Sequence, residues 1–156
     1  MDPSVQDETP ARLSGLTSWL MTQTAAHAGR LVADGFARAG ARGYHYRVLA
    51  SLDEFGPASQ AALGRRSGIH VSDIVATINE LAQTGLVERA PDQADRRRNV
   101  ITVTPAGRQR LRWLDEQVLH IQNDLLAPLS ENERAELRRL LRRLLSHHRA
   151  EAKQEP

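Results

Sequence analysis

Apolar residues recur every three or four positions along most of the chain, and this period is typical of helices that bury one face. Glycine and proline separate the runs, and both residues favour turns and helix ends. The pattern predicts helices over residues 12–38, 44–55, 59–66 and 71–84, from 105 to the proline at 128, and over 131–149.

The pattern changes between the helices predicted at 71–84 and from 105. Residues 86–90 and 99–103 are β-like, whereas the stretch between them, 91–98, is polar and rich in turn-forming residues. These features predict a two-stranded hairpin with a long charged tip. Thr104 is placed to cap the following helix, with Pro105 at its first position.

This order of elements predicts a mainly α fold with a small β-hairpin wing, in which a helix-turn-helix precedes the wing. The terminal helices, 11–40 and 105–149, carry more apolar surface than one small domain can bury. The leucines concerned are Leu13, Leu16, Leu20, Leu137, Leu141, Leu144 and Leu145. We expect these helices to form a bundle shared by two identical chains, with packing inside one chain as the alternative. Flexible tails are expected at 1–10 and 150–156.

Charge is distributed unevenly along the chain. The net charge is only +2, but residues 42–112 hold 11 arginines and seven acidic residues, whereas the rest is slightly acidic. All basic residues except Lys153 are arginines. Arginine forms paired hydrogen bonds with phosphate and guanine. A GC-rich genome would also favour arginine over lysine, but it would not explain why arginines gather in the middle of the chain.

Composition excludes several classes of function. The chain has no cysteine, which excludes disulfides, thiolate metal sites and cysteine redox sensing. It shows no signal-peptide pattern and no apolar run long enough to span a membrane, so a cytoplasmic protein without membrane partners is expected. Adjacent residues on a helix point about 100° apart, so His147 and His148 do not predict a metal site. No nucleophile–base pair or phosphate loop indicates an enzyme, and no cofactor is expected.

Three stretches resemble the MarR family (multiple antibiotic resistance regulators). They are QAALGRRSGI at 60–69, NELAQTGLVER at 79–89 and DRRRNVITVTPAG at 95–107. The third is the most specific, because it combines the wing with the start of the next helix. The resemblance covers about residues 12–149. It implies a winged helix-turn-helix lobe at 41–104 that binds double-stranded DNA, in a homodimer that a small anionic or phenolic molecule often releases.

The resemblance also implies which residues contact DNA. The first residues of a recognition helix reach base edges in the major groove, and arginines near the helix-turn-helix contact phosphates. The helix at 71–84 departs from the family pattern, since it lacks arginine and lysine, and Ala76 stands where many relatives have a basic residue. Base reading is therefore expected to rely on polar and methyl contacts. The helix-turn-helix candidates are Arg65, Arg66, His70, Val71, Ser72, Val75, Ala76 and Asn79; Ser72 could instead cap the helix, as could Asp73.

The wing is expected to supply much of the positive charge. In the family, one arginine of the Asp-Arg-Arg stretch supports the wing while another enters the minor groove. Carried over, Arg96 or Arg97 reads the groove and Asp95 orients it, with Arg98 beside them. A narrow minor groove attracts arginine through its negative potential. The alternative is a solvated charged loop.

The resemblance also implies an effector pocket between the dimerisation helices and the DNA-binding lobe. Histidine, tyrosine and arginine could orient a carboxylate or phenolate there, although ordinary core packing would also explain these residues. The candidates are Trp19, Gln23, His27, Tyr44, His45, Tyr46, Arg47 and Trp113.

Together these expectations predict a transcriptional regulator, most simply a repressor. It would bind a palindromic operator with half-sites about one helical turn apart. The alternative is a winged-helix adaptor that binds proteins and no specific DNA. The neutral recognition helix favours the adaptor, whereas the three arginines of the wing favour the regulator.

Overall fold

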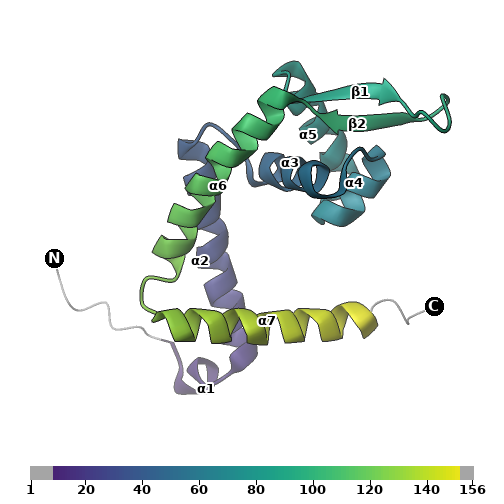
Figure 1. Ribbon diagram of the computed structural model, residues 1–156. Coiled ribbons are helices and arrows are strands. Elements are labelled where there is room, and N and C mark those ends of the chain that lie inside the picture. The colour runs from purple at the N-terminus through teal and green to yellow at the C-terminus, as the bar shows by residue number, and fades with distance from the viewer. Residues whose placement is uncertain (1–8, 152–156) are drawn as a thin grey trace. The chain divides into compact units, whose positions relative to one another are not determined.

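The computed structural model describes residues 9–151. Figure 1 shows a mainly helical chain with one β-hairpin, which confirms the predicted fold class and order of elements. The elements are α1 (Ala11–Ser14), α2 (Thr17–Arg38), α3 (Gly43–Phe55), α4 (Gln60–Ser67), α5 (Val71–Gln83), β1 (Val87–Pro91), β2 (Asn99–Val103), α6 (Pro105–Leu125) and α7 (Glu131–Glu151). Residues up to Ile121 form one compact unit and those from Gln122 form another.

The prediction of one continuous helix over 12–38 is wrong. The chain breaks after α1, where Gly15 is the C-cap and Leu16 is extended at φ −89° and ψ 119°. The Ser14 hydroxyl donates to the carbonyl of Ala11 at 3.1 Å. Such local side-chain bonds compete with the helical ladder, and glycine adds its own entropic cost, so the helix restarts at Thr17.

The helix-turn-helix forms where it was predicted. Ser59 caps α4 by accepting from the amide of Ala62 at 3.2 Å. Gly68 then adopts φ 62° and ψ 34°, a left-handed conformation that favours glycine. This turn brings α5 against α4, where the position of a Gly64 Cβ would lie 3.3 Å from the carbonyl oxygen of Ile69. The turn therefore sets the angle between α4 and α5.

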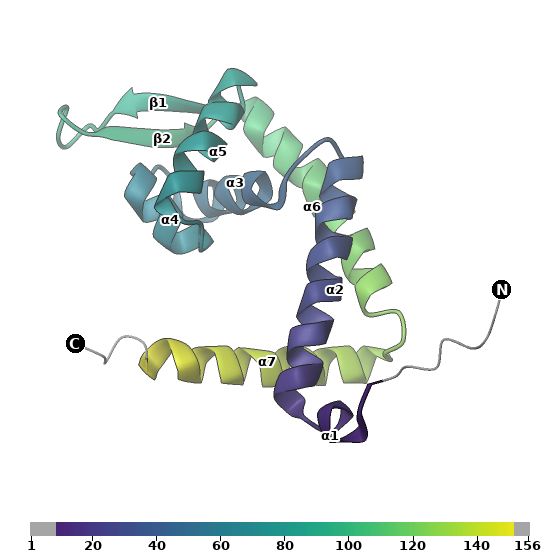
Figure 2. The same cartoon turned by 180° about the vertical axis from the view of Figure 1, so that it is seen from behind.

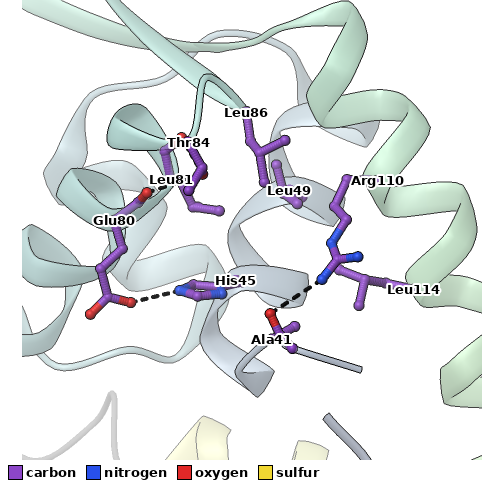
Figure 3. Close-up of a pocket in the computed structure, with 10 residues that line it drawn as sticks. Ala41, His45, Leu49, Glu80, Leu81, Thr84, Leu86, Arg110 and Leu114 are labelled. Carbon is purple, nitrogen blue, oxygen red and sulfur yellow. Dashed lines mark hydrogen bonds and ion pairs between the residues drawn. The ribbon is translucent and has the colours of Figure 1, made fainter. Parts of the chain in front are cut away.

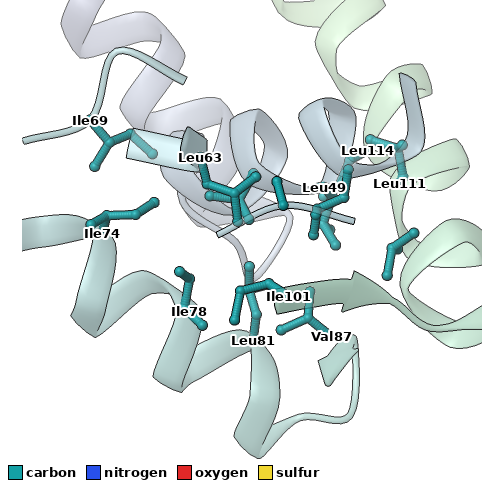
Figure 4. Close-up of a cluster of buried hydrophobic side chains, with 14 of the residues drawn as sticks. Leu49, Leu63, Ile69, Ile74, Ile78, Leu81, Val87, Ile101, Leu111 and Leu114 are labelled. Atoms are coloured by element: carbon teal, nitrogen blue, oxygen red, sulfur yellow. The ribbon is translucent and has the colours of Figure 1, made fainter. Parts of the chain in front are cut away.

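The core of the first unit lies among α3, α4, α5, α6 and the hairpin (Figure 4). Its fully buried side chains include Val48, Leu49, Leu52, Leu63, Ile74, Ile78, Leu81, Ile101 and Leu114. α5 contributes three of these residues at spacings of four and three, which is why its opposite face is exposed.

The two strands of the wing pair with each other in antiparallel fashion, and β2 also bonds to the segment before α4. Val87 pairs with Val103 and Pro91 with Asn99. On the outer side of β2, Ala58 and Ile101 exchange two backbone hydrogen bonds of 3.1 and 2.8 Å. β2 is therefore hydrogen-bonded on both of its edges, whereas the tip of the hairpin at 92–98 projects away (Figure 1).

Side-chain caps stand at the start of α6 and of α7. Thr104 accepts from the amide of Gly107 at 3.0 Å, as predicted for the start of α6. At the start of α7, the Glu133 carboxylate accepts from both the amide and the hydroxyl of Ser130, which lowers the pKa of Glu133. α2 and α6 cross in both ribbon views (Figure 2), and the side chain of Ile121 touches Gly35 so closely that a Cβ would not fit.

Apolar residues remain on the surface of both terminal helices. Leu16 and Leu20 are about half exposed, as are Leu140, Leu141, Leu144 and Leu145 of α7. Of the tails predicted at 1–10 and 150–156, residues 1–8 and 152–156 lie outside the described residues. α7 extends to Glu151, past the predicted end at 149. No helix within residues 9–151 is both long and apolar enough to cross a membrane.

Candidate nucleic-acid interface

The outward face of α5 is short, exposed and uncharged at its centre. Val71 is 72% exposed and Val75 38%, and Ser72, Ala76 and Asn79 are exposed beside them. The predicted base-reading residues therefore share one accessible surface, opposite the buried face of the helix. That surface could enter a groove without rearrangement of the core.

His70, not Ser72 or Asp73, caps α5. The His70 Nδ1 atom accepts from the amide of Ser72 at 3.4 Å. It also lies 2.9 Å from the Ser72 hydroxyl oxygen, which donates to it. The alternative that Ser72 itself caps the helix is wrong, because the His70 ring two residues earlier takes that role. The Ser72 hydroxyl thus has a hydrogen-bond partner within the protein, although the residue is exposed.

Asn79 is held by the wing. The Arg89 guanidinium on β1 donates to the Asn79 side-chain oxygen at 2.5 Å. Arg89 was part of the family resemblance but carried no assigned role in the sequence, because nothing in its spacing shows that β1 returns beside α5. This bond joins the recognition helix to the hairpin and orients the Asn79 amide.

The wing tip is an ordered turn with exposed arginines. The Asp95 carboxylate accepts from the amide of Arg97 at 3.1 Å and lies 3.6 Å from the Arg98 Nε atom. The Asp92 amide donates to the carbonyl of Arg98 at 2.7 Å and closes the loop. Asp95 thus pairs with Arg98 instead of the guanidinium of Arg96 or Arg97, and those two side chains extend into solvent.

Arg65 and Arg66 lie in the exposed last turn of α4. The Arg66 guanidinium lies 5.2 Å from the centroid of the Phe55 ring, a cation–π arrangement that limits its motion. Arg65 and Val71 both line a hollow of about 330 Å³, together with Gly64 and Ile69. Positive charge therefore borders the neutral face of α5 on the α4 side.

A polar cluster joins the far end of α5 to α3. The Glu80 carboxylate bonds to His45 at 2.7 Å and to Arg42 at 3.0 Å. The His45 Nδ1 atom accepts from the amide of Arg42 at 3.3 Å, so its Nε2–H donates to Glu80. Sequence reasoning missed Arg42 and Glu80, since no local pattern relates positions so far apart in the chain.

A cavity of about 330 Å³ lies beside this cluster (Figure 3). Its lining is mainly apolar, with four polar side chains among Gly40, Ala41, His45, Leu49, Glu80, Leu81, Thr84, Leu86, Arg110 and Leu114. Arg110 donates through Nη2 to the carbonyls of Ala39 and Gly40 at 2.7 and 3.2 Å. Its guanidinium also lies 4.4 Å from the centroid of the Trp113 ring, so the arginine is fixed at the cavity edge.

The structure does not gather the eight predicted pocket residues. Only His45 lines this cavity. Tyr46 donates to Asp115 at 3.0 Å and packs on Phe36, and burial together with that carboxylate raises the pKa of Tyr46. The other six residues, on α2, α3 and α6, are not part of the lining, although Trp113 packs against Arg110 at its edge. They are Trp19, Gln23, His27, Tyr44, Arg47 and Trp113. Within residues 9–151, no cluster of His, Asp or Glu side chains could hold a metal ion.

Comparison with known proteins gives a consistent result. A family model described as "MarR family" matches residues 34–98. A Thauera aromatica protein that carries the name of a transcriptional regulatory protein for the hcr operon is 38% identical over 86 residues, 55% of this chain and 52% of its own. The match thus spans about half the length of that curated relative.

Solved structures match over most of the chain. The crystal structure of a probable transcriptional regulator from Pseudomonas aeruginosa has a TM-score of 0.75 and 33% identity, and the match covers 85% of this chain and 99% of that one. Bordetella bronchiseptica BpsR, described with the regulation of its DNA binding by 6-hydroxynicotinic acid, has a TM-score of 0.76. Its identity is 21%, with 87% of this chain and 97% of that chain covered, so this likeness shows the fold.

Proposed function

Because the chain belongs to the MarR family of winged-helix transcriptional regulators, we propose that it binds operator DNA and regulates transcription, most simply as a repressor. Members of this family are not enzymes, and its fold provides a reader of DNA. The expected place of action is the cytoplasm, where the protein can reach DNA.

The arrangement of the wing beside α5 carries this proposal. The exposed side chains of Arg96, Arg97 and Arg98 project on a hairpin whose first strand is bonded to α5 through Arg89 and Asn79. A helix in the major groove and an arginine-bearing wing in the neighbouring minor groove would be held at a fixed spacing. The alternative, a protein-binding adaptor, does not explain why three exposed arginines stand at the tip of a hairpin that is bonded to α5.

We infer a homodimer from the surface of the terminal helices. The half-exposed leucines of α7 follow helical spacing, and such a stripe is typical of helices that pair with other helices. A two-fold dimer presents two α5 helices, so it favours a palindromic operator with half-sites about one helical turn apart.

An effector is proposed for the cavity beside His45 and Glu80. A guanidinium has five N–H groups, so the bonds from Arg110 Nη2 leave Nε and Nη1 able to bind an anion. The apolar remainder of the lining suits an aromatic ring. BpsR, which is described with the regulation of its DNA binding by 6-hydroxynicotinic acid, lends support to a small anionic or phenolic molecule. Such a ligand would contact α5 directly and shift the population of DNA-binding conformations.

The test is binding to DNA, with sequence selection and a salt series. The full chain is offered the DNA upstream of its own coding sequence and a pool of random duplexes, and its affinity is measured from low to high salt. We expect an imperfect palindrome and a steep loss of affinity with salt, because each phosphate contact releases counterions. The Arg96→Ala, Arg97→Ala double variant should lower the affinity at least tenfold and flatten the salt slope by roughly two.

Arg112→Ala is the matched control, because Arg112 is an exposed arginine on α6 and its loss should leave the salt slope nearly unchanged. If neither DNA source yields a preferred sequence and the wing variant binds like the wild type, the regulator function is wrong and the adaptor replaces it. Hydroxylated aromatic acids, 6-hydroxynicotinate included, can then be added to the same assay, and Arg110→Gln should weaken any release that they cause.

A further inference from the structure

We propose that α5 discriminates bases chiefly through the 5-methyl groups of thymine, with Val71 and Val75 as the specificity-determining residues. This inference rests on the proposed DNA-binding function. It concerns what α5 reads, whereas the wing and α4 supply affinity.

The first observation is the exposure of apolar side chains where base edges would lie. Val71 is 72% exposed and Val75 38%, and the exposed Ala76 continues this surface. These side chains lie outside the buried core to which Ile74 and Ile78 of the same helix belong. Their apolar surface is therefore available to a partner in the groove.

The second observation is that the neighbouring polar groups have partners inside the protein. The Ser72 hydroxyl donates to His70 Nδ1, which is itself the helix cap. The Asn79 side-chain oxygen accepts from Arg89. Paired reading of adenine by asparagine needs that oxygen as an acceptor, and the Arg89 bond occupies one of its two lone pairs and fixes the orientation of the amide. Hydrogen-bond readout by this face is thus limited.

The third observation concerns charge. No arginine or lysine lies between His70 and Gln83, so α5 cannot form the paired arginine–guanine contact that is the commonest specific contact in the major groove. Arginines instead border the helix, on α4 and at the wing tip. Their positive charge complements phosphates on either side of a groove. The apolar face of α5 between them would then contact the edges of the bases. The 5-methyl group of thymine is the apolar group that base pairs present there.

The experiment replaces each thymine of the selected operator, one at a time, with deoxyuridine, which lacks only the methyl group. We expect one or two replacements in each half-site to weaken wild-type binding by about three- to fivefold, the factor for one buried methyl-sized group. In Val71→Ala or Val75→Ala protein, the replacement facing the shortened side chain should change the Kd less than twofold. Alanine favours helix more than valine does, so both variants should fold, and thermal unfolding checks this.

Two controls separate methyl reading from general loss of affinity. Deoxyuridine at the base pairs that the wing contacts should not change the Kd. The wing enters the minor groove, whereas the 5-methyl group of thymine lies in the major groove. Arg97→Ala should weaken binding to thymine and deoxyuridine operators in equal proportion. If the wild type prefers its operator but no deoxyuridine replacement changes the Kd by twofold, the methyl inference is wrong and the regulator function stands. If no operator can be selected at all, the regulator function fails, and this inference fails with it.

Discussion

His45 on α3 and Glu80 on α5 are joined by a hydrogen bond of 2.7 Å between Nε2 and Oε2. The same carboxylate pairs with Arg42 at 3.0 Å. The recognition helix is therefore bonded at its C-terminal half to α3, in addition to its apolar packing on the core. The bond also forms part of the wall of the cavity proposed for the effector.

Glu80→Ala should lower the free energy of unfolding by about 1–2 kcal/mol, because a half-buried histidine donor loses a charged acceptor. Glu80→Gln should recover part of this loss, since its amide oxygen can still accept from His45. Urea unfolding measures both variants. Glu54→Ala, at an exposed position of α3, is the control, and an equal effect of Glu54→Ala and Glu80→Ala would contradict a role for this cluster.

Asp95→Ala offers a test in which the sign of the effect is informative. Removing a negative charge from a DNA-binding surface should strengthen binding if charge alone mattered. The structure predicts the opposite, because Asp95 holds the turn through the Arg97 amide and pairs with Arg98. We expect the operator affinity to fall about three- to tenfold, the effect of one or two poorly placed phosphate or groove contacts. Glu116→Ala on α6 removes the same charge elsewhere, and its affinity should not fall.

Local sequence signals predicted most of this fold correctly. Gly68 marks the turn of the helix-turn-helix, and Thr104 with Pro105 marks the start of α6, because each acts on backbone groups within a few residues. The break after Ser14 was missed, since the leucine spacing continues across it. Periodicity reports which face of a helix is apolar and does not detect a single interrupted turn.

The site was predicted less completely than the fold. The exposed residues of α5 and the wing followed from the position of the motif in the chain. The bonds from Arg89 to Asn79 and from His45 to Glu80 did not, because they join residues 10 and 35 positions apart through the tertiary fold. The pocket prediction followed the family resemblance and took residues from three helices, of which only His45 lines the cavity. On a helix, neighbouring residues such as Tyr44, His45 and Tyr46 point in different directions.

Gly107 is required by close packing in the first turn of α6. An added Cβ would overlap the carbonyl oxygen of Leu86 and lie 2.8 Å from a methyl carbon of Val103. Gly107→Ala should therefore destabilise the protein by about 1–3 kcal/mol or more, since backbone must move to admit the methyl. Gly29→Ala is the matched control, because nothing lies within 4 Å of its Cβ position on α2, and there alanine should stabilise by about 0.5–1 kcal/mol. Thermal unfolding distinguishes the two, and a shift in the same direction for both would refute the packing argument.

Tyr46 should make stability depend on alkaline pH. Burial, followed by its bond to Asp115 and the charge of that carboxylate, raises the pKa of Tyr46 above the ordinary value of about 10. Because this pKa is higher in the folded than in the unfolded protein, the stabilisation from neutral Tyr46 is complete below about pH 10. It is lost as the pH rises through the folded-state pKa. The free energy of unfolding should therefore fall with pH in that range.

The chain has two tyrosines, so Tyr44→Phe leaves Tyr46 as the sole phenol. The ultraviolet absorbance of phenolate in this variant should then report ionisation above pH 10, and unfolding in urea should shift it to lower pH. Tyr46→Phe should remove the extra alkaline loss of stability and, by deleting the donor to Asp115, should cost about 1 kcal/mol at neutral pH. Asp115→Asn keeps an acceptor while removing the charge, so it should lower the ionisation pH of Tyr46 toward the ordinary value. An unchanged titration in that variant would show that Asp115 does not act on Tyr46.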